Sequence, residues 1–259
     1  MTILAVYSNK GGVGKTATAV NLAYLASQSG LKTLVLDLDP QSSATFYFRI
    51  KPKLKRKARG LLRPGSPVER SIKGTDYGNL DLLPGDFTHR NLDITFYRHK
   101  RSKHRLGRIL RPLKKEYDLI IIDCLPTINI LAENIFNAAD IFLVPLIPTT
   151  LSVRTHEQLI SFLQETDRDL SAVRIFFSMV DRRKKMHQEL QDVVRQEFSG
   201  VLQTAIPYSS TIEKMGLERQ PVPAFAPNSF VAAVYRDLWS EVRDIFPARG
   251  KRSRSRKSK

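Results

Sequence analysis

The chain has 259 residues, 42% of them hydrophobic, which suits one large folded domain rather than a disordered polypeptide. Its apolar runs are far shorter than the roughly 20 residues of a membrane span, it lacks the basic start of a signal peptide, and its single cysteine, Cys124, excludes an intramolecular disulfide. The net charge of +17 and the isoelectric point of about 10.1 predict a polyanionic partner, either nucleic acid or an anionic membrane surface. We therefore expect a cytoplasmic protein with no membrane span.

Apolar, β-branched runs alternate with helical patterns along the chain. The runs predict strands at residues 3–7, 33–37, 80–83, 119–123, 141–145, 174–180 and 201–206. Helices are predicted at 14–29, 129–137, 151–166 and 187–198, and an amphipathic helix at 230–246. This order is typical of βαβ units, so we expect an α/β fold: a doubly wound, mostly parallel sheet with helices on both faces. Residues 1–246 are expected to form one domain.

Three clusters of lysine and arginine carry much of the positive charge. They cover residues 49–65, 98–115 and 249–259. None is interleaved with aromatic residues, which favours contact with phosphates over stacking on single-stranded bases. Residues 247–259 have almost nothing apolar to bury, so we expect a disordered basic tail there.

A glycine-rich run at residues 9–16, NKGGVGKT, joins the first predicted strand to the first predicted helix. Lys15 can reach the outer phosphates of a nucleotide, and the Thr16 hydroxyl can bind Mg²⁺. The ordinary phosphate-loop pattern requires glycine where Asn9 stands, and it does not explain the second lysine, Lys10. Backbone N–H groups turn toward a phosphate most easily at glycines, here Gly11, Gly12 and Gly14.

Aspartates end two of the predicted strands. Asp37 and Asp39 follow the second strand, and Asp123 follows three isoleucines at the end of the fourth. Carboxylates at the carboxyl ends of central parallel strands lie where ligands bind in doubly wound sheets. Asp123 suits Mg²⁺, directly or through a water, and Asp39 suits positioning of an attacking water. For Asp37, a nucleotide-facing role and a turn-forming role both remain open.

Five segments together resemble the ParA/MinD family of deviant-Walker ATPases, and within it the ParA partition ATPases. Leu125 departs from the family's usual Asp-Cys-Pro-Pro sequence after the Walker B strand. The likeness runs from about residue 2 to residue 246 and is carried by KGGVGKTATAVNLA (10–23), DLDPQSSAT (37–45), YDLIIIDCLPT (117–127), FFSMVDRRKKMHQEL (176–190) and TAIPYSSTIEKMGLERQPV (204–222).

The resemblance implies a deviant-Walker P-loop NTPase with ATP and Mg²⁺ as cofactors. It implies catalytic roles for Lys10, Lys15 and Asp39, and metal contacts from Thr16, Asp39 and Asp123. The residues implied to hold the nucleotide are Gly11, Gly12, Val13, Gly14, Lys15, Thr16, Ala17, Asp123, Met179, Asp181 and Pro207.

Lys10 is explained by the same resemblance. In these ATPases the first lysine reaches across a nucleotide-sandwich homodimer to the partner's phosphates. Two facing triphosphates would repel each other unless cations from each subunit bridged them, so the role is physically reasonable. We expect Lys10 to couple ATP binding to dimerisation.

Non-specific DNA is the partner that the sequence favours. The segment at 230–246 mixes acidic with basic residues on its polar face, which favours a helix packed on the sheet over a membrane-surface helix. No helix-turn-helix is apparent ahead of the loop, which fits a ParA type that does not read DNA sequence. The candidate DNA-contacting residues are Arg182, Arg183, Lys184, Arg219, Lys251, Arg252 and Arg254.

The sequence thus predicts a nucleoid-associated ATPase that positions a plasmid, chromosome or protein cargo, with a ParB-type partner that stimulates slow hydrolysis. Two alternatives stay open. One is a MinD-like ATPase acting at a membrane. The other is a nucleic-acid-binding protein whose ATP site is only structural.

Overall fold

A computed structural model describes residues 1–51, 68–86 and 102–246. Its strands are β1 (Thr2–Val6), β2 (Thr33–Asp37), β3 (Lys73–Gly74), β4 (Leu80–Leu83), β5 (Leu119–Asp123), β6 (Ile141–Leu146), β7 (Val173–Val180) and β8 (Val201–Pro207). Its α-helices are α1 (Lys15–Gln28), α2 (Ser43–Tyr47), α5 (Arg105–Leu110), α6 (Ile130–Ala138), α7 (Thr150–Glu165), α8 (Lys185–Glu197), α9 (Ser210–Glu213), α10 (Met215–Glu218), α11 (Val222–Phe225) and α12 (Phe230–Asp244). Short 3₁₀ turns lie at Val68–Ser71, Ser102–His104, Arg111–Lys115 and Leu170–Ala172.

The strands of the described residues form one sheet in the order β3-β4-β2-β5-β1-β6-β7-β8. All neighbours are parallel except the short edge pair β3 and β4. The glycine-rich loop follows β1, and β1 lies between β5 and β6. The predicted α/β fold with a mostly parallel sheet is confirmed.

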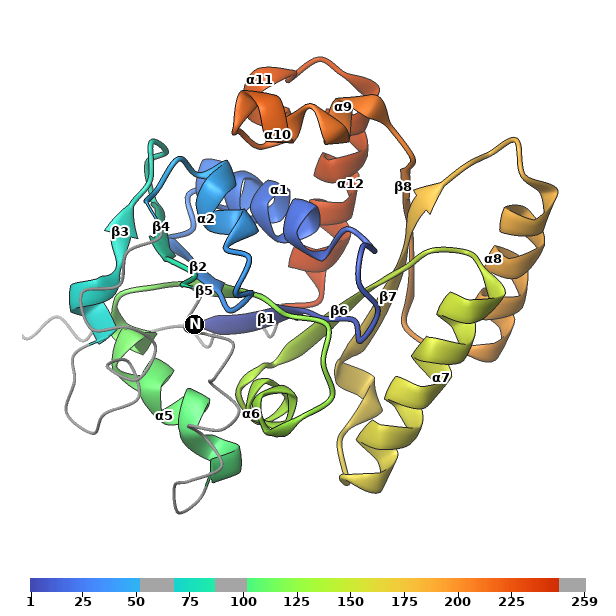
Figure 1. Cartoon of the computed structure of the whole chain (residues 1–259), viewed down its shortest axis with the longest axis horizontal. Helices are drawn as coiled ribbons and strands as arrows, with labels where there is room; N and C mark the ends of the chain where they lie inside the picture. Colours follow the sequence, from blue (N-terminus) through green and yellow to red (C-terminus); the bar gives the residue numbers. More distant parts are fainter. Residues whose placement is uncertain (52–67, 87–101, 247–259) are drawn as a thin grey trace, which may run out of the picture.

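Alternate residues of the buried strands point to opposite faces, and each face has its own core. Leu4 and Ile121 pack with apolar residues of α1 and α12. Ile3 and Ile120 pack with residues of α5, α6, α7 and α8. Helices therefore cover both faces of the sheet, as Figure 1 shows.

All seven predicted strands are present with ends within one residue, and the four interior helices are present with ends within two. The predicted final helix is α12, and its apolar stripe is buried against the sheet, which confirms the packing interpretation: Val231, Val234, Leu238 and Val242. Within residues 1–51, 68–86 and 102–246, no helix combines the length and apolarity needed to cross a membrane.

Part of the second basic cluster has a packing role that sequence analysis did not predict. Leu106, Leu110 and Leu113 are buried in the core beneath α5 and the following 3₁₀ turn. Residues 52–67, 87–101 and 247–259, which include most of the other basic residues of the three clusters, lie outside the described residues.

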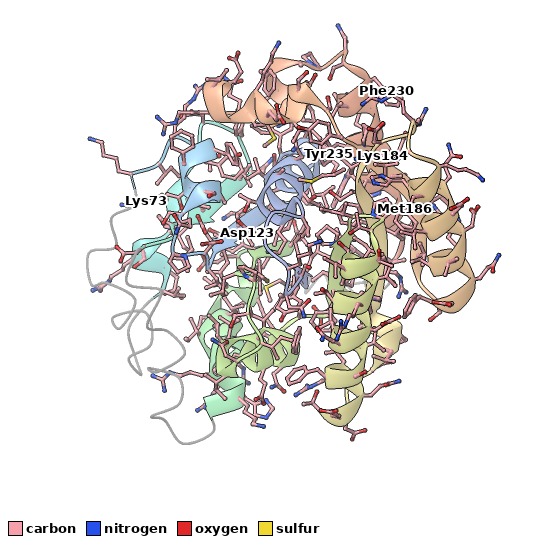
Figure 2. All side chains as sticks on the ribbon, turned by 45° about the vertical axis from the view of Figure 1, so that its right-hand side comes forward. Lys73, Asp123, Lys184, Met186, Phe230 and Tyr235 are labelled. Atoms are coloured by element: carbon pink, nitrogen blue, oxygen red, sulfur yellow. The ribbon has the colours of Figure 1, made fainter. Side chains whose placement is uncertain are left out.

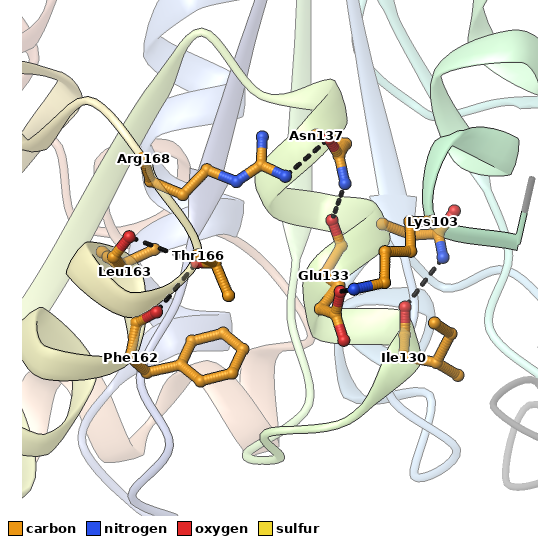
Figure 3. Close-up of polar contacts among 9 residues, drawn as sticks. Lys103, Ile130, Glu133, Asn137, Phe162, Leu163, Thr166 and Arg168 are labelled. Carbon is orange, nitrogen blue, oxygen red and sulfur yellow. Dashed lines mark hydrogen bonds and ion pairs between the residues drawn. The ribbon is translucent and has the colours of Figure 1, made fainter.

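A polar network holds the edge of the sheet opposite the glycine-rich loop (Figure 3). The Arg168 guanidinium, just before β7, donates to the Asn137 side chain at 2.7 Å, and Asn137 donates to the Glu133 carbonyl one turn earlier in α6. The Glu133 carboxylate pairs with Lys103 at 2.7 Å. The Arg168 bond ties α6 to the segment that leads into β7, and the ion pair ties α6 to the 3₁₀ turn at Ser102–His104.

Candidate nucleotide-binding site

The loop between β1 and α1 has the conformation of an anion-binding loop. Gly12 and Gly14 have φ values of 72° and 90°, which glycine adopts without the strain of a side chain. Gly14 is also the N-cap of α1, and no side chain in the described residues caps that helix. The first N–H groups of α1 are therefore available to an anion.

Gly14 also contacts a strand that lies two positions away in the sheet. A Cβ atom on Gly14 would lie 3.0 Å from the Ser178 hydroxyl of β7. The loop thus leans over β6 toward β7, which brings it to the strand that leads into residues 179–181. Sequence analysis gave no signal for Ser178, because the two residues are 164 positions apart.

Lys15 points back into the loop. Its side chain is buried, and its Nζ donates to the Lys10 carbonyl at 2.9 Å. Burial lowers the pKa of Lys15, while the nearby charge of Asp123 acts in the opposite direction. A buried ammonium beside the uncapped first turn of α1 concentrates positive potential where a phosphate would bind.

Asp123 is a fully buried carboxyl group at the end of β5 (Figure 2). Burial, followed by the charge of Asp37 on the adjacent strand, raises its pKa well above the usual range. The Thr16 hydroxyl acts the other way, but neither carboxyl oxygen of Asp123 has a partner in hydrogen-bonding geometry among the described residues. Such a group needs a cation to be stable in its charged form.

Asp37 is buried beside Asp123 but has its own partners. Its carboxylate accepts from the Thr45 backbone N–H at 2.9 Å and from the Thr45 hydroxyl at 2.6 Å. Desolvation raises the pKa of Asp37 to about 6. Gly85 lies against this group, since a Cβ on Gly85 would come within 2.9 Å of the carboxylate. Asp37 therefore holds the start of α2, a structural role that the sequence had left open.

Asp39 lies in the loop between β2 and α2. Its backbone N–H donates to Asp37 at 3.2 Å, and its side chain accepts from the Gln41 N–H at 2.9 Å. The side chain is partly exposed, at the same edge of the sheet as the glycine-rich loop. This is the position from which a carboxylate can reach a water beside a bound phosphate.

Lys10 is bound to a helix of its own chain. Its Nζ donates to the Ser152 hydroxyl in the first turn of α7 at 2.8 Å, and Ser152 also contacts Thr149 at 3.0 Å. Sequence analysis missed Ser152, which lies 142 residues away.

A pocket of about 260 Å³ lies where β7 and β8 end. Three of the residues implied to hold the nucleotide follow Asp123 in the chain, and two of them, Asp181 and Pro207, line this pocket. The third, Met179, precedes Val180 of the pocket wall and has a φ of 55°, within an irregular part of β7. The remaining lining residues are Arg182, Arg183, Tyr208 and Phe230.

The residues predicted to contact DNA differ in their partners and surroundings. Arg183 makes two hydrogen bonds of 3.0 Å to Asp181, which lower the pKa of Asp181 to about 2. Arg182 lies 5.7 Å from the centre of the Phe230 ring. Lys184 is exposed at the start of α8. The predicted residues Lys251, Arg252 and Arg254 lie outside the described residues.

Arg219 is bound to α2 instead of being free on a basic face. Its Nε donates to the Phe46 carbonyl at 3.1 Å, and its guanidinium lies 4.5 Å from the centre of the Phe46 ring.

Comparison with known proteins places this site in a family. A protein-family model described as an AAA domain matches residues 1–175, more than half of the chain. The sporulation initiation inhibitor protein Soj of Bacillus subtilis is 30% identical over 246 residues, which cover 93% of this chain and 97% of Soj. The chain belongs to the ParA/MinD family of P-loop ATPases.

Other known proteins are similar to this chain over nearly its whole length. The virulence plasmid ParA family protein pGP5-D of Chlamydia psittaci is 29% identical over 93% of this chain and 94% of that protein. Among solved structures, cobyrinic acid a,c-diamide synthase from Mycobacterium smegmatis with bound ADP and magnesium has a TM-score of 0.77 at 26% identity, covering 94% of each chain. A putative plasmid partition protein from Borrelia burgdorferi bound to AMPPNP has a TM-score of 0.82 at 22% identity, covering 94% and 99%, and so shares the fold.

Proposed function

We propose that this ParA/MinD-family chain is a partition-type ATPase with residues 1–246 as its catalytic domain. In this proposal it binds ATP and Mg²⁺, forms an ATP-sandwich homodimer, binds DNA without sequence preference, and positions a cargo over the nucleoid in the cytoplasm. A ParB-type or cargo-adaptor protein stimulates its slow hydrolysis.

The observation that carries the proposal is the state of Asp123. This carboxyl group is completely buried, has no hydrogen-bond partner for either oxygen among the described residues, and lies beside Lys15 and Thr16. Apolar packing does not explain such a group, whereas a divalent cation held between it, the Thr16 hydroxyl and a phosphate does. The residues at this site therefore fit Mg²⁺·ATP.

Each site residue has a defined task in ATP hydrolysis. The backbone of residues 11–17 and the buried Lys15 ammonium hold the phosphates. Thr16 and Asp123 would hold Mg²⁺, which would neutralise charge on the phosphate oxygens. Asp39 would contribute to the metal site and orient the attacking water, and Asp181, Pro207 and Met179 would surround the base. ATP and water give ADP and phosphate.

Lys10 connects nucleotide to dimerisation in this proposal. Its ammonium group is bound to Ser152 of the same chain. A hydrogen bond between a charged amine and a neutral hydroxyl is weaker than one to a triphosphate. We expect Lys10 to leave Ser152 when a partner subunit presents ATP.

DNA is the polyanion that the molecule fits best. The net charge of +17 supports sequence-independent phosphate contact. Dimerisation doubles the basic surface, and linked sites gain affinity without new contacts, so ATP can control DNA binding. The burial of the apolar stripe of α12 disfavours the MinD-like alternative, because a membrane-surface helix must present that stripe to lipid.

The decisive experiment measures DNA binding at one moderate salt concentration without nucleotide, with ADP and with ATP·Mg²⁺. We expect binding with ATP in both the wild type and Asp39→Ala, which holds ATP but does not hydrolyse it. Equal binding in every nucleotide state would instead support a nucleic-acid-binding protein with a structural ATP site. Pelleting with anionic vesicles in place of DNA tests the membrane alternative.

A further inference from the structure

Two segments that border the nucleotide site meet again on the outer surface of the molecule, at the contact between α2 and α10. The first segment runs from Asp37 through Asp39 into α2. The second runs from Pro207, in the wall of the pocket, through α9 into α10. We call the contact between α2 and α10 the arginine joint.

Two arginines make this joint. Arg219, at the C-terminal end of α10, donates from Nε to the Phe46 carbonyl at 3.1 Å and places its guanidinium 4.5 Å from the centre of the Phe46 ring. Arg49, just after α2, donates in the reverse direction to the Glu218 carbonyl at 3.0 Å. Each segment thus holds a backbone carbonyl of the other.

Backbone strain is concentrated at the same place. Six non-glycine residues in the described part of the chain have a positive φ, and three of them flank α2 or end α10: Ser42 at 56°, Arg49 at 60° and Arg219 at 50°. Non-glycine residues keep such conformations only where surrounding contacts impose them. The joint therefore fixes a conformation that a free α2 would not keep.

A continuous set of contacts leads from this joint to Asp39. Phe46 follows Thr45, whose N–H and hydroxyl both donate to the Asp37 carboxylate. The other oxygen of that carboxylate accepts from the Asp39 N–H, and the Asp39 carbonyl accepts from the Ser42 N–H at 2.9 Å. A helix of five residues cannot hold its place by itself, so its position depends on its two ends.

We propose that Arg219 is a positioning residue: it clamps α2 against α10 and so fixes the Asp39 loop for hydrolysis. Through α9 and α10, this clamp at the arginine joint also links the Asp39 loop to Pro207 in the wall of the pocket. This proposal rests on the proposed ATPase function for its kinetic consequence, whereas the clamp itself is a property of the nucleotide-free fold. It replaces the DNA-contacting role predicted for Arg219.

The test compares two substitutions at one position. Arg219→Gly removes the side chain and relieves the positive φ, so it should fold. Arg219→Lys keeps the charge, but lysine lacks both the Nε donor and the planar guanidinium. It therefore cannot donate to the Phe46 carbonyl and lie flat on the Phe46 ring at the same time. Arg236→Ala is the matched control, because Arg236 also donates to a backbone carbonyl, that of Pro227 at 3.0 Å, and is remote from α2 in sequence.

Native-state hydrogen exchange of the Thr45, Phe46 and Phe48 amides reports the clamp directly. We expect roughly tenfold faster exchange in both Arg219 variants and no change in Arg236→Ala. With saturating ATP·Mg²⁺, we expect kcat to fall about three- to tenfold in both variants, with KM for ATP nearly unchanged.

Unchanged exchange of these amides in Arg219→Gly would overturn the clamp. A second result would also overturn the clamp: wild-type exchange and kcat in Arg219→Lys together with loss of DNA affinity in Arg219→Gly. It would mean that Arg219 acts through its charge on DNA. Binding of a fluorescent ATP analogue to the wild type is measured separately. Its absence would contradict the proposed function, and the exchange result would still decide whether the clamp exists.

Discussion

Aspartates lie at both edges of the sheet, and their surroundings differ. At the edge where strands begin, Asp140 accepts from the Ile3 N–H at 2.7 Å and Asp118 accepts from the Lys32 N–H at 3.0 Å. At the edge where strands end, Asp123 is buried with no hydrogen-bond partner among the described residues. One edge uses carboxylates to join strands, and the other keeps one unpaired.

The difference shows how a single fold separates stability from chemistry. Carboxylates that accept backbone N–H groups stabilise the fold in their charged form. A buried carboxylate without partners destabilises the nucleotide-free protein, because its charge has lost its hydration. Binding of a cation offsets this cost. The two edges therefore respond differently to substitution, pH and ligand.

The largest expected effect comes from Asp123→Asn, which keeps the shape of the side chain but removes its charge. We expect Mg²⁺-dependent ATP turnover to fall by about 10²- to 10³-fold, while the melting temperature without nucleotide does not fall. Steady-state turnover and thermal unfolding measure the two outcomes. Turnover near that of the wild type would remove Asp123 from the metal site.

The second effect is a dependence of stability on pH. Burial raises the pKa of Asp37 from 3.8 to about 6, so the folded protein binds more protons than the unfolded chain between those values. The nucleotide-free protein should therefore lose stability, on the order of 2–3 kcal/mol, as pH rises from about 4 to 7. The raised pKa of Asp123 acts in the same direction.

Denaturant unfolding across this pH range measures the effect. Asp37→Asn should flatten the profile, because it removes the titrating group and keeps an oxygen for Thr45. A wild-type stability that rises steadily over the same range would contradict the assignment.

The third effect is at the opposite edge. Asp140→Ala leaves the Ile3 N–H without its acceptor, which should lower the free energy of unfolding by about 1–2 kcal/mol. The kcat of the folded fraction should stay at the wild-type value, since Asp140 lies at the other end of the strands. A loss of kcat without a loss of stability would show that the two edges are coupled.

The smallest effect separates two neighbouring cations. Arg183 is paired with Asp181, so Arg183→Ala should leave the salt dependence of DNA binding almost unchanged. Lys184→Ala removes an exposed charge and should reduce the slope of log K against log salt by about one if Lys184 contacts a phosphate. Slopes equal to the wild-type slope in both variants would mean that neither residue contacts DNA.

Local pattern was sufficient to predict seven of the eight described strands, all but the two-residue β3, and the glycine-rich loop. A run such as Leu119–Asp123 can be buried only in a central strand, and glycines at 12 and 14 satisfy a local backbone requirement. The packed final helix was predictable for the same reason, because its apolar stripe repeats every turn.

Contacts between distant segments could not be predicted. Nothing near Lys10 indicates Ser152, and nothing near Arg219 indicates Phe46, which lies 173 residues away. The short helices α2 and α5 were also missed, because five or six residues give too little periodicity to detect. Nothing in the sequence indicated that Arg183 and Arg219, both predicted to contact DNA, also have hydrogen-bond partners within the fold.

The central position of β1 in the sheet has a consequence for folding during synthesis on the ribosome. Thr2–Val6 is synthesised before both of its sheet neighbours, β5 at Leu119–Asp123 and β6 at Ile141–Leu146. More than a hundred residues must be synthesised before this apolar strand gains a neighbour, at about 5–20 residues per second. The nascent chain therefore carries this apolar strand without a sheet neighbour for several seconds, a period in which unpaired strands are prone to aggregation.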